Sequence, residues 1–286
     1  MVCHIIPYRF LALDIEAHHQ ESRQLTLEQA IFDLRGEDLG LRVYAAWWLG
    51  RFRVDVPEAI DGLIAALDDE DDRTDAGGYP LRRNAARALG KLANQRAVPA
   101  LLLALECSDF YVREAAAQAL ESLGDSECIL RLVELLNDQI PGTHPAPEPP
   151  YLSQPFDAII EALGTLGAMK ARALIEPFLE HSVPRIQYAA LRAMFQLTPD
   201  SQVASQYGER LVKGLSCENL QLRRVILTDL GAIGYLPAAP AISQTLAENS
   251  LKLISLKGVL EKQVSSTSSA LSREALEVMK LMDELL

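Results

Sequence analysis

The stretch RRNAARALG at residues 82–90 carries the pattern that decides the fold. It has an arginine first, a pair of small residues three and four positions on, and Leu-Gly at seven and eight. Helical offsets of three, four and seven place these residues on one face of a helix. The phrase recurs, with substitutions at some positions, at residues 42–50, 113–120, 156–164 and 223–231. Small residues on the shared face allow a neighbouring helix to lie close.

Recurrence of a helical phrase along the whole chain indicates stacked helix pairs. The first four copies begin 31 to 43 residues apart. We therefore predict an all-α fold, an open right-handed α/α solenoid of HEAT- or armadillo-like repeats with five to seven helix pairs. The alternative of separate globular domains is disfavoured, because each repeat needs its neighbours to bury its apolar face.

The pattern divides the chain into three parts. Residues 1–24 are predicted to form an N-terminal arm, and residues 25–264 the solenoid, with insertions at 68–80 and 141–150. Residues 265–286 are predicted to form a serine-rich joint and a capping helix. We expect the insertion at 68–80 to fold over the concave side, since insertions gather on one edge of a solenoid.

Charge and cysteine usage exclude several classes of function. The net charge of −12 disfavours a nucleic-acid partner, which needs clustered positive potential. No run of eighteen apolar residues predicts a membrane span. Widely spaced cysteines predict neither a disulfide nor a metal site, and they indicate reduced thiols in the cytoplasm. The cysteines are Cys3, Cys107, Cys128 and Cys217.

Three segments depart from the bland Leu/Ala pattern of a helical repeat. Trp47 and Trp48 are adjacent, so one of them must lie outside a narrow core stripe, unless both fill gaps between repeats. An acidic insertion ends at Gly77-Gly78 and brings Tyr79 beside the arginines at 82, 83 and 87. The turn at residues 106–114 is expected to lie alongside it.

Arginine forks suit bidentate binding of carboxylates, so the second segment predicts a site for a flat, anionic ligand. The alternative is a salt-bridge ladder between repeats, with Asp72 and Asp75 as internal partners of the arginines. Sequence signatures of common enzyme classes are absent, including the P-loop, G-x-S-x-G and H-E-x-x-H.

The same three segments resemble a known family, the E-type subunits of the E/F-type phycobilin lyases. The resemblance rests on residues 45–52, 72–87 and 107–116 and is sharpest over residues 41–125. It implies a heterodimer with an F-type subunit that attaches phycocyanobilin by a thioether to a cysteine of the apo-phycocyanin alpha subunit. The related lyase-isomerases of phycoerythrocyanin share the E-type sequence, so both activities stay open, as does a HEAT-repeat adaptor without chemistry.

The resemblance also implies roles for individual side chains. Arginines would bind the two propionates of the pigment, aromatic rings would contact its pyrroles, and a carboxylate would manage the proton of thiol addition. Phycocyanobilin would be a substrate, with no cofactor permanently bound and no metal. The candidate carboxylates are Asp72 and Asp75. The candidate pigment-binding residues are Trp47, Arg73, Tyr79, Arg82, Arg83, Arg87, Tyr111 and Arg113.

Overall fold

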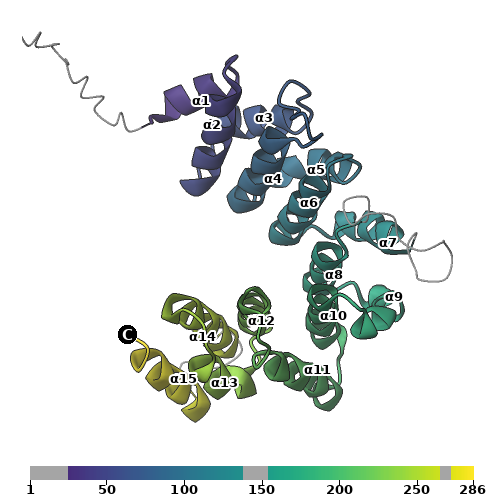
Figure 1. Cartoon of the computed structure of the whole chain (residues 1–286), viewed down its shortest axis with the longest axis vertical. Helices are drawn as coiled ribbons and strands as arrows, with labels where there is room; N and C mark the ends of the chain where they lie inside the picture. The colour runs from purple at the N-terminus through teal and green to yellow at the C-terminus, as the bar shows by residue number, and fades with distance from the viewer. Residues whose placement is uncertain (1–24, 138–153, 265–271) are drawn as a thin grey trace, which may run out of the picture.

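The chain is a curved, all-helical solenoid in a computed structural model that describes residues 25–137, 154–264 and 272–286 (Figure 1). Within these ranges the backbone forms α-helices, short 3₁₀ turns and loops, and no strand. Seven helix pairs follow one another, which confirms the predicted helical repeat. The pairs are α1 (Leu27–Leu34) with α2 (Leu39–Arg51), α3 (Pro57–Ala66) with α4 (Pro80–Leu92), α5 (Val98–Ala104) with α6 (Phe110–Leu123), α7 (Ile129–Asn137) with α8 (Phe156–Thr165), α9 (Arg172–Ile175) with α10 (Pro184–Leu197), α11 (Ser201–Gly214) with α12 (Leu220–Ile233), and α13 (Ala239–Gln244) with α14 (Asn249–Val264).

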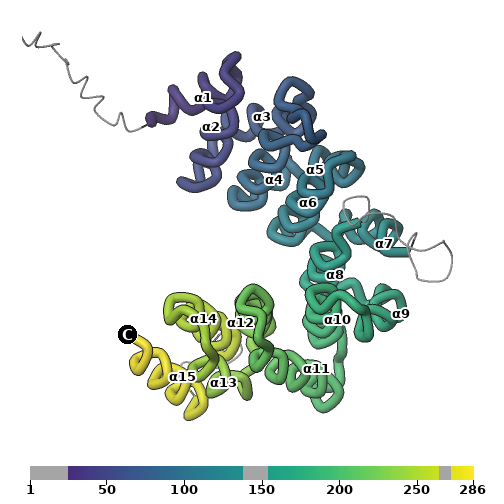
Figure 2. Tube along the Cα trace, viewed as in Figure 1, coloured from purple at the N-terminus to yellow at the C-terminus, as the bar shows by residue number. Residues whose placement is uncertain are grey.

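The pairs build two layers. The even-numbered helices from α2 to α14 pack side by side as the inner layer, and the odd-numbered helices lie outside them. The trace follows an open arc whose concave face is lined by the inner helices (Figure 2).

The Leu-Gly of the repeated phrase sets how closely the inner helices approach. A β-carbon added at Gly50 would lie 2.7 Å from the Cα of Ala88, and one at Gly90 would lie 2.9 Å from the Cα of Ala119. A methyl group does not fit at either position, so glycine allows a backbone contact that alanine would force apart. The predicted close packing of helices through small residues is confirmed.

The arginine that opens the phrase is a structural residue. Arg113 Nη1 donates to the carbonyl oxygens of Cys107 at 2.7 Å and Ser108 at 3.1 Å. Arg223 Nη1 donates to the equivalent carbonyl of Cys217 at 2.5 Å. Each guanidinium thus satisfies carbonyls in the turn before its own helix, which a buried backbone requires.

Helix starts carry the residue types that usually cap or open a helix. Thr26 caps α1 by accepting the N–H of Gln29 at 3.2 Å, and Asp109 caps α6 by accepting the N–H of Tyr111 at 2.8 Å. Pro57 occupies the first turn of α3, where its missing N–H costs nothing.

The insertion at 68–80 lies elsewhere than expected. Asp69 pairs with Arg42 in the first turn of α2, and the N–H of Tyr79 donates to Asp109 Oδ2 at 2.8 Å at the start of α6. The insertion therefore lines the edge at which α2, α4 and α6 begin, rather than covering the concave face. The expectation was wrong because the acidic side chains pair with arginines at the helix starts.

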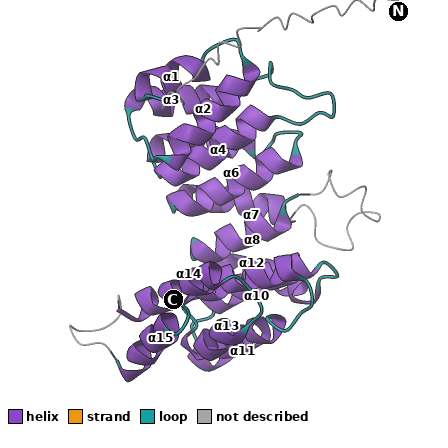
Figure 3. Cartoon of the chain, turned by 60° about the vertical axis from the view of Figure 1, so that its left-hand side comes forward, coloured by secondary structure: helices purple, strands orange, loops and turns teal. Residues whose placement is uncertain are grey.

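A last helix, α15 (Arg273–Asp283), packs against α13 and α14 through buried Ala275 and Val278 (Figure 3). The predicted arm at 1–24, the insertion at 141–150 and the serine-rich stretch up to residue 271 lie outside the described residues. No helix in the described ranges has the length and apolar character that crossing a bilayer requires.

Candidate functional site

The sequence-predicted site residues separate into two places. Most of them lie at the edge where α4 and α6 begin, and Trp47 and Arg87 lie on the concave face. The turn at 106–114 does lie beside Tyr79, as expected, through the hydrogen bond from the Tyr79 N–H to Asp109.

Asp72 and Tyr79 are buried parts of this edge. The Asp72 carboxylate accepts the N–H of Leu81, so it caps α4 in place of a residue directly before the helix. Tyr79 is only 5% exposed, and its hydroxyl donates to Glu70 at 3.0 Å. Asp75 and Arg73 are exposed on the same insertion, with the Arg73 guanidinium 5.7 Å from the Tyr79 ring centroid. None of these four residues lines the hollow between α4 and α6 that is described below.

Arg82 is fully engaged by the protein. Its Nε donates to the carbonyl of Asp69 at 2.6 Å, its Nη2 pairs with Glu70 at 2.5 Å, and its guanidinium lies 4.2 Å from the Tyr79 ring centroid. Hydrogen bonds from Tyr79 and Arg82 lower the pKa of Glu70. For Arg82, this arrangement favours the alternative in which the arginines form salt bridges within the protein instead of binding a ligand. Its partners are Asp69 and Glu70, however, and not the expected Asp72 and Asp75.

Arg83, Tyr111 and Arg113 occupy the neighbouring helix starts. Arg83 is half-buried and its guanidinium lies 5.8 Å from the ring centroid of exposed Tyr111. Arg113 is buried and holds the turn before α6, and burial lowers its pKa. Arg83 and Tyr111 thus remain accessible, whereas Arg82 and Arg113 serve the fold.

One position of the repeated phrase faces the concave side in successive inner helices, and we call these residues the inner row. It lies five residues after the start of each copy, so α2, α4, α6 and α8 present different side chains at equivalent places. In α10 the equivalent residue is Arg192, because neighbouring Ala193 meets Gly164 as Ala88 meets Gly50. The inner row is Trp47, Arg87, Gln118, Glu161 and Arg192.

Trp47 begins this row as an exposed aromatic face. It is 43% exposed and stacks on Tyr44 with ring centroids 5.5 Å apart, whereas Trp48 is half-buried against Phe52. One tryptophan of the pair therefore does lie outside the core.

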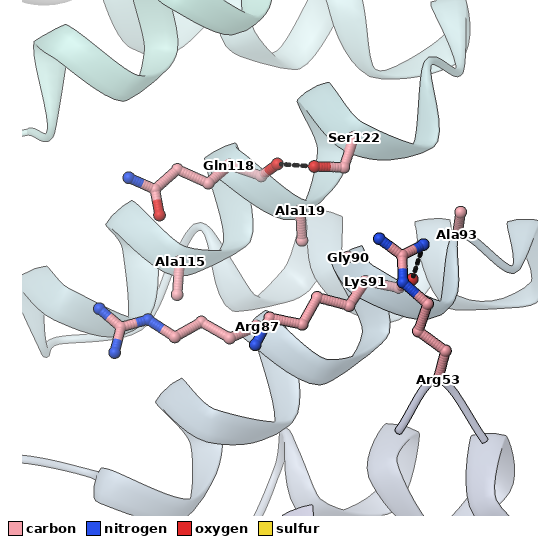
Figure 4. A pocket seen from close by; sticks show the side chains of 9 residues that line it. All are labelled: Arg53, Arg87, Gly90, Lys91, Ala93, Ala115, Gln118, Ala119 and Ser122. Atoms are coloured by element: carbon pink, nitrogen blue, oxygen red, sulfur yellow. Dashed lines mark hydrogen bonds between the residues drawn. The ribbon is translucent and has the colours of Figure 1, made fainter. Parts of the chain in front are cut away.

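A basic hollow lies next to Trp47 along the row, between α4 and α6. Its volume is about 530 Å³ (Figure 4). Gly90, Ala115 and Ala119 line it with small residues, and Arg53, Arg87 and Lys91 supply three cations. In the close view Arg87 and Arg53 extend toward opposite ends of the hollow. One dashed line marks Arg53 Nη1 donating to the Lys91 carbonyl at 3.3 Å, and the other marks the Ser122 hydroxyl donating to the Gln118 carbonyl at 2.9 Å. The remaining lining residues are Ala93, Gln118 and Ser122.

The cations of this hollow lack carboxylate partners. Within the described ranges, no ion pair involves Arg53, Arg87 or Lys91, although the chain carries a net charge of −12. Three such cations beside small apolar residues give this hollow a locally positive lining in a protein that is acidic overall.

Of the three cations that line the hollow, Arg87 is a candidate named from the sequence, whereas Arg53 and Lys91 are not. Lys91 follows Arg87 by four residues, which places both on one helix face, so the spacing already carried that signal. Arg53 enters the hollow from the turn after α2, where its φ of 52° lies in the left-handed region. No pattern in the sequence indicates that conformation, because glycine is the residue that usually adopts it.

Further along the inner row, the charged side chains form ion pairs with one another. Arg192 pairs with Glu121 at 2.5 Å, Glu161 at 3.2 Å and Asp229 at 3.3 Å, and its side chain is 8% exposed. Arg192 of α10 therefore reaches across α8 to α6. Arg185 makes a parallel bridge, to Glu114 of α6 at 3.0 Å and to Asp157 of α8.

Burial also changes the acidity of this network. It raises the pKa of Asp229 to about 7. The pKa of Glu161 is raised well above its ordinary value, first by burial and then by the charge of Asp229. Removing charged carboxylates from water favours their neutral form, and the single guanidinium offsets this only in part.

Comparison with known proteins assigns a family. The PBS lyase HEAT-like repeat matches residues 41–69, and HEAT repeats match residues 75–142. The phycocyanobilin lyase subunit alpha of Microchaete diplosiphon is 69% identical over 98% of this chain and 100% of that protein. The bilin biosynthesis protein PecE of Mastigocladus laminosus is 46% identical over 87% of this chain and 86% of that protein.

A solved structure shows the same architecture. The complex of CpcE and CpcF of phycocyanin lyase from Nostoc sp. PCC7120 contains a chain 56% identical to this one, with a TM-score of 0.84. The match covers 95% of this chain and 98% of that chain, so the similarity extends through the whole solenoid.

Proposed function

Since this chain belongs to the family of phycocyanobilin lyase alpha subunits, we propose that it binds phycocyanobilin as one subunit of a heterodimeric, cytoplasmic bilin lyase. Its partner is an F-type subunit, and the pair joins the pigment by a thioether to a cysteine of the apo-phycocyanin alpha subunit. The related protein solved as a complex with CpcF supports the heterodimer.

The main support for a pigment site in this chain is the basic hollow between α4 and α6. A bilin has two propionates, and Arg53, Arg87 and Lys91 offer three cations that have no carboxylate partner among the described residues. The glycine and alanine residues of its lining leave room for a planar ring system, which bulkier side chains would exclude. Arg87 thus keeps the role that the resemblance implies, and Arg53 and Lys91 join it.

Aromatic contact comes from the neighbouring inner helix. Trp47 precedes Arg87 in the inner row, so a pigment seated in the hollow meets an exposed indole on the next helix. Arg83 and Tyr111 lie accessible at the start of α4 and α6 and contact the end of the same ligand. Tyr79 is buried and contributes to folding instead.

This chain needs no nucleophile for the reaction. The attacking thiol belongs to the acceptor protein, so the subunit contributes orientation of the pigment and control of protons. Its buried Cys128 has a pKa raised to about 11 by burial, which keeps that thiol neutral and unreactive near pH 7.

The proposed pigment site can be tested by comparing substitutions of Arg87 and Arg82, which lie in the same helix. With the partner co-purified, Arg87→Ala should weaken phycocyanobilin binding, measured by absorbance titration, by about 1.5–3 kcal/mol, and should leave thermal unfolding unchanged. Arg82→Ala is the matched control and should instead lower the unfolding temperature, because it strands Glu70 and the Asp69 carbonyl. Unchanged pigment affinity in Arg87→Ala, with Arg53→Ala and Lys91→Ala equally silent, would remove the hollow from the site.

The runner-up is a lyase-isomerase subunit of phycoerythrocyanin. The higher identity to phycocyanobilin lyase subunits than to PecE favours the lyase. The absorption spectrum of the product separates them, since isomerisation changes the conjugation of the pigment. A non-catalytic adaptor would give no thioether with any acceptor, whichever F-type partner is supplied.

A further inference from the structure

The network around Arg192 has more carboxylates than its guanidinium can neutralise. Glu121, Glu161 and Asp229 come from three different inner helices and converge on one side chain of a fourth. Their full ionisation would leave two uncompensated negative charges in a mostly buried site. Such a site is stable when a carboxyl keeps its proton.

An oxygen of the network is without a partner. Asp229 is 1% exposed, and its Oδ2 has no hydrogen-bond partner in the described structure. A buried, unpartnered carboxylate oxygen costs desolvation energy with no return. A proton on the Asp229–Glu161 pair relieves that cost, in accord with the raised pKa of both groups.

The network opens onto the face that holds the basic hollow. Glu161 occupies the inner row, two helices beyond Arg87, and its side chain is 15% exposed. Glu121 directly follows Leu120 in α6 and precedes Ser122, which lines the hollow. Glu161 is therefore accessible from the concave side, whereas Asp229 lies behind it.

On the proposed function, we infer that the carboxyl cluster of Glu121, Glu161 and Asp229 supplies the proton for thioether formation, with Glu161 as the group that donates it to the pigment. Asp229 and Arg192 are positioning residues, because they hold the proton on the cluster without touching the pigment.

The step balances without any further reactant. The acceptor sulfur bonds to the ethylidene carbon of ring A, the exocyclic double bond opens, and the proton of Glu161 adds to the conjugated system at the adjacent ring carbon. The proton released by the acceptor thiol returns the glutamate to its acid form. The enzyme is unchanged after each addition, and no oxidation occurs.

Within the described ranges, the charged groups around Glu161 lie on the inner helices. They are Glu121 of α6, Asp157 of α8, Arg185 and Arg192 of α10, and Asp229 of α12. Carboxylates outnumber arginines in this set, so the balance favours protonation of Glu161.

The test compares Glu161→Gln with Glu176→Gln, a matched amide substitution at an exposed carboxylate outside the cluster. With saturating phycocyanobilin, Glu161→Gln should form the thioether at least tenfold more slowly, while pigment affinity stays within twofold. Glu176→Gln should stay within threefold of wild type in both.

The pH profile adds a readout that a merely structural role would not move. At each pH, the rate of thioether formation by wild type is divided by the rate of Glu161→Gln, which cancels the titration of the acceptor thiol. This ratio should fall as pH rises through the pKa of the cluster. Asp229→Asn should shift this fall to lower pH, because the amide removes a negative charge that helps to keep the proton on Glu161. If Glu161→Gln proves unstable by circular dichroism, the rates of wild type and Asp229→Asn are compared directly at each pH, because titration of the acceptor thiol is common to both.

The inference is overturned if Glu161→Gln transfers pigment within threefold of the wild-type rate. It is also overturned if the rate falls at the same pH in Asp229→Asn as in wild type. Either result leaves the proposed function intact provided that the wild-type pair binds pigment. Absence of pigment binding in wild type would instead overturn the proposed function itself.

Discussion

Arg87 and Arg192 occupy the same position of the repeat on inner helices of the same solenoid, yet their surroundings are opposite. Arg87 is exposed and has no carboxylate partner in the described structure, whereas Arg192 is buried among three carboxylates. Register alone therefore does not assign a role to a charged residue on the concave face. Its role depends on what the two neighbouring helices present to it.

The difference arises largely from one departure from the phrase. Most copies end in Leu-Gly, but α6 has Glu121 where Gly50, Gly90 and Gly164 stand in other helices. A carboxylate at that place lies between α6 and α8 and reaches Arg192. The N-terminal repeats thus present cations that have no ion pair among the described residues. In the middle repeats, the charged residues at the equivalent positions pair with one another.

The largest expected effect concerns Arg192. Arg192→Met should destabilise the protein by about 3–5 kcal/mol, because it leaves three buried carboxylates without their counter-charge. Arg87→Met should change stability by less than about 0.5 kcal/mol, since its side chain is exposed. Denaturant unfolding followed by circular dichroism measures both. Equal effects of the two substitutions would mean that the two environments do not differ in solution.

A smaller effect sharpens the description of the middle region. The pKa of Asp229 is raised in the folded protein to about 7, above the value of about 3.9 expected in the unfolded chain. The folded state therefore binds the proton more tightly, and this group's contribution to stability is lost as pH rises from about 4 to 7. Asp229→Asn should remove that loss, so the difference in unfolding free energy between variant and wild type should change by about 2–4 kcal/mol across this range. A constant difference would contradict a protonated cluster.

The smallest effect tests the open region. Arg53 adopts a left-handed backbone conformation that glycine adopts more readily, so Arg53→Gly should leave stability unchanged or raise it by up to about 1 kcal/mol. It should nevertheless weaken pigment binding, because it removes a cation of the basic hollow. Reduced stability together with full pigment affinity would show that Arg53 serves the turn and not the ligand.

The fold could be predicted from the sequence because its decisive contacts are local and repeated. The offsets of the phrase place Gly50 and Gly90 at helix contacts, and the caps at Thr26 and Asp109 are visible as residue types. These features depend on helix geometry alone.

The candidate site was less predictable because its features depend on partners distant in sequence. Sequence reasoning treated the arginines near Tyr79 as one patch, but Arg82 is held by the insertion while Arg87 points to the concave face. Arg192 joins residues of three other helices, up to 71 positions away, and no local pattern indicates that convergence.

Asp109 joins two repeats through a single side chain. One carboxylate oxygen caps its own helix at the Tyr111 N–H, and the other accepts the N–H of Tyr79 just before α4, both at 2.8 Å. The start of α4 is thus completed only by a residue made thirty positions later. During synthesis the second repeat must therefore wait for the third, and the two should fold as one cooperative unit rather than in succession.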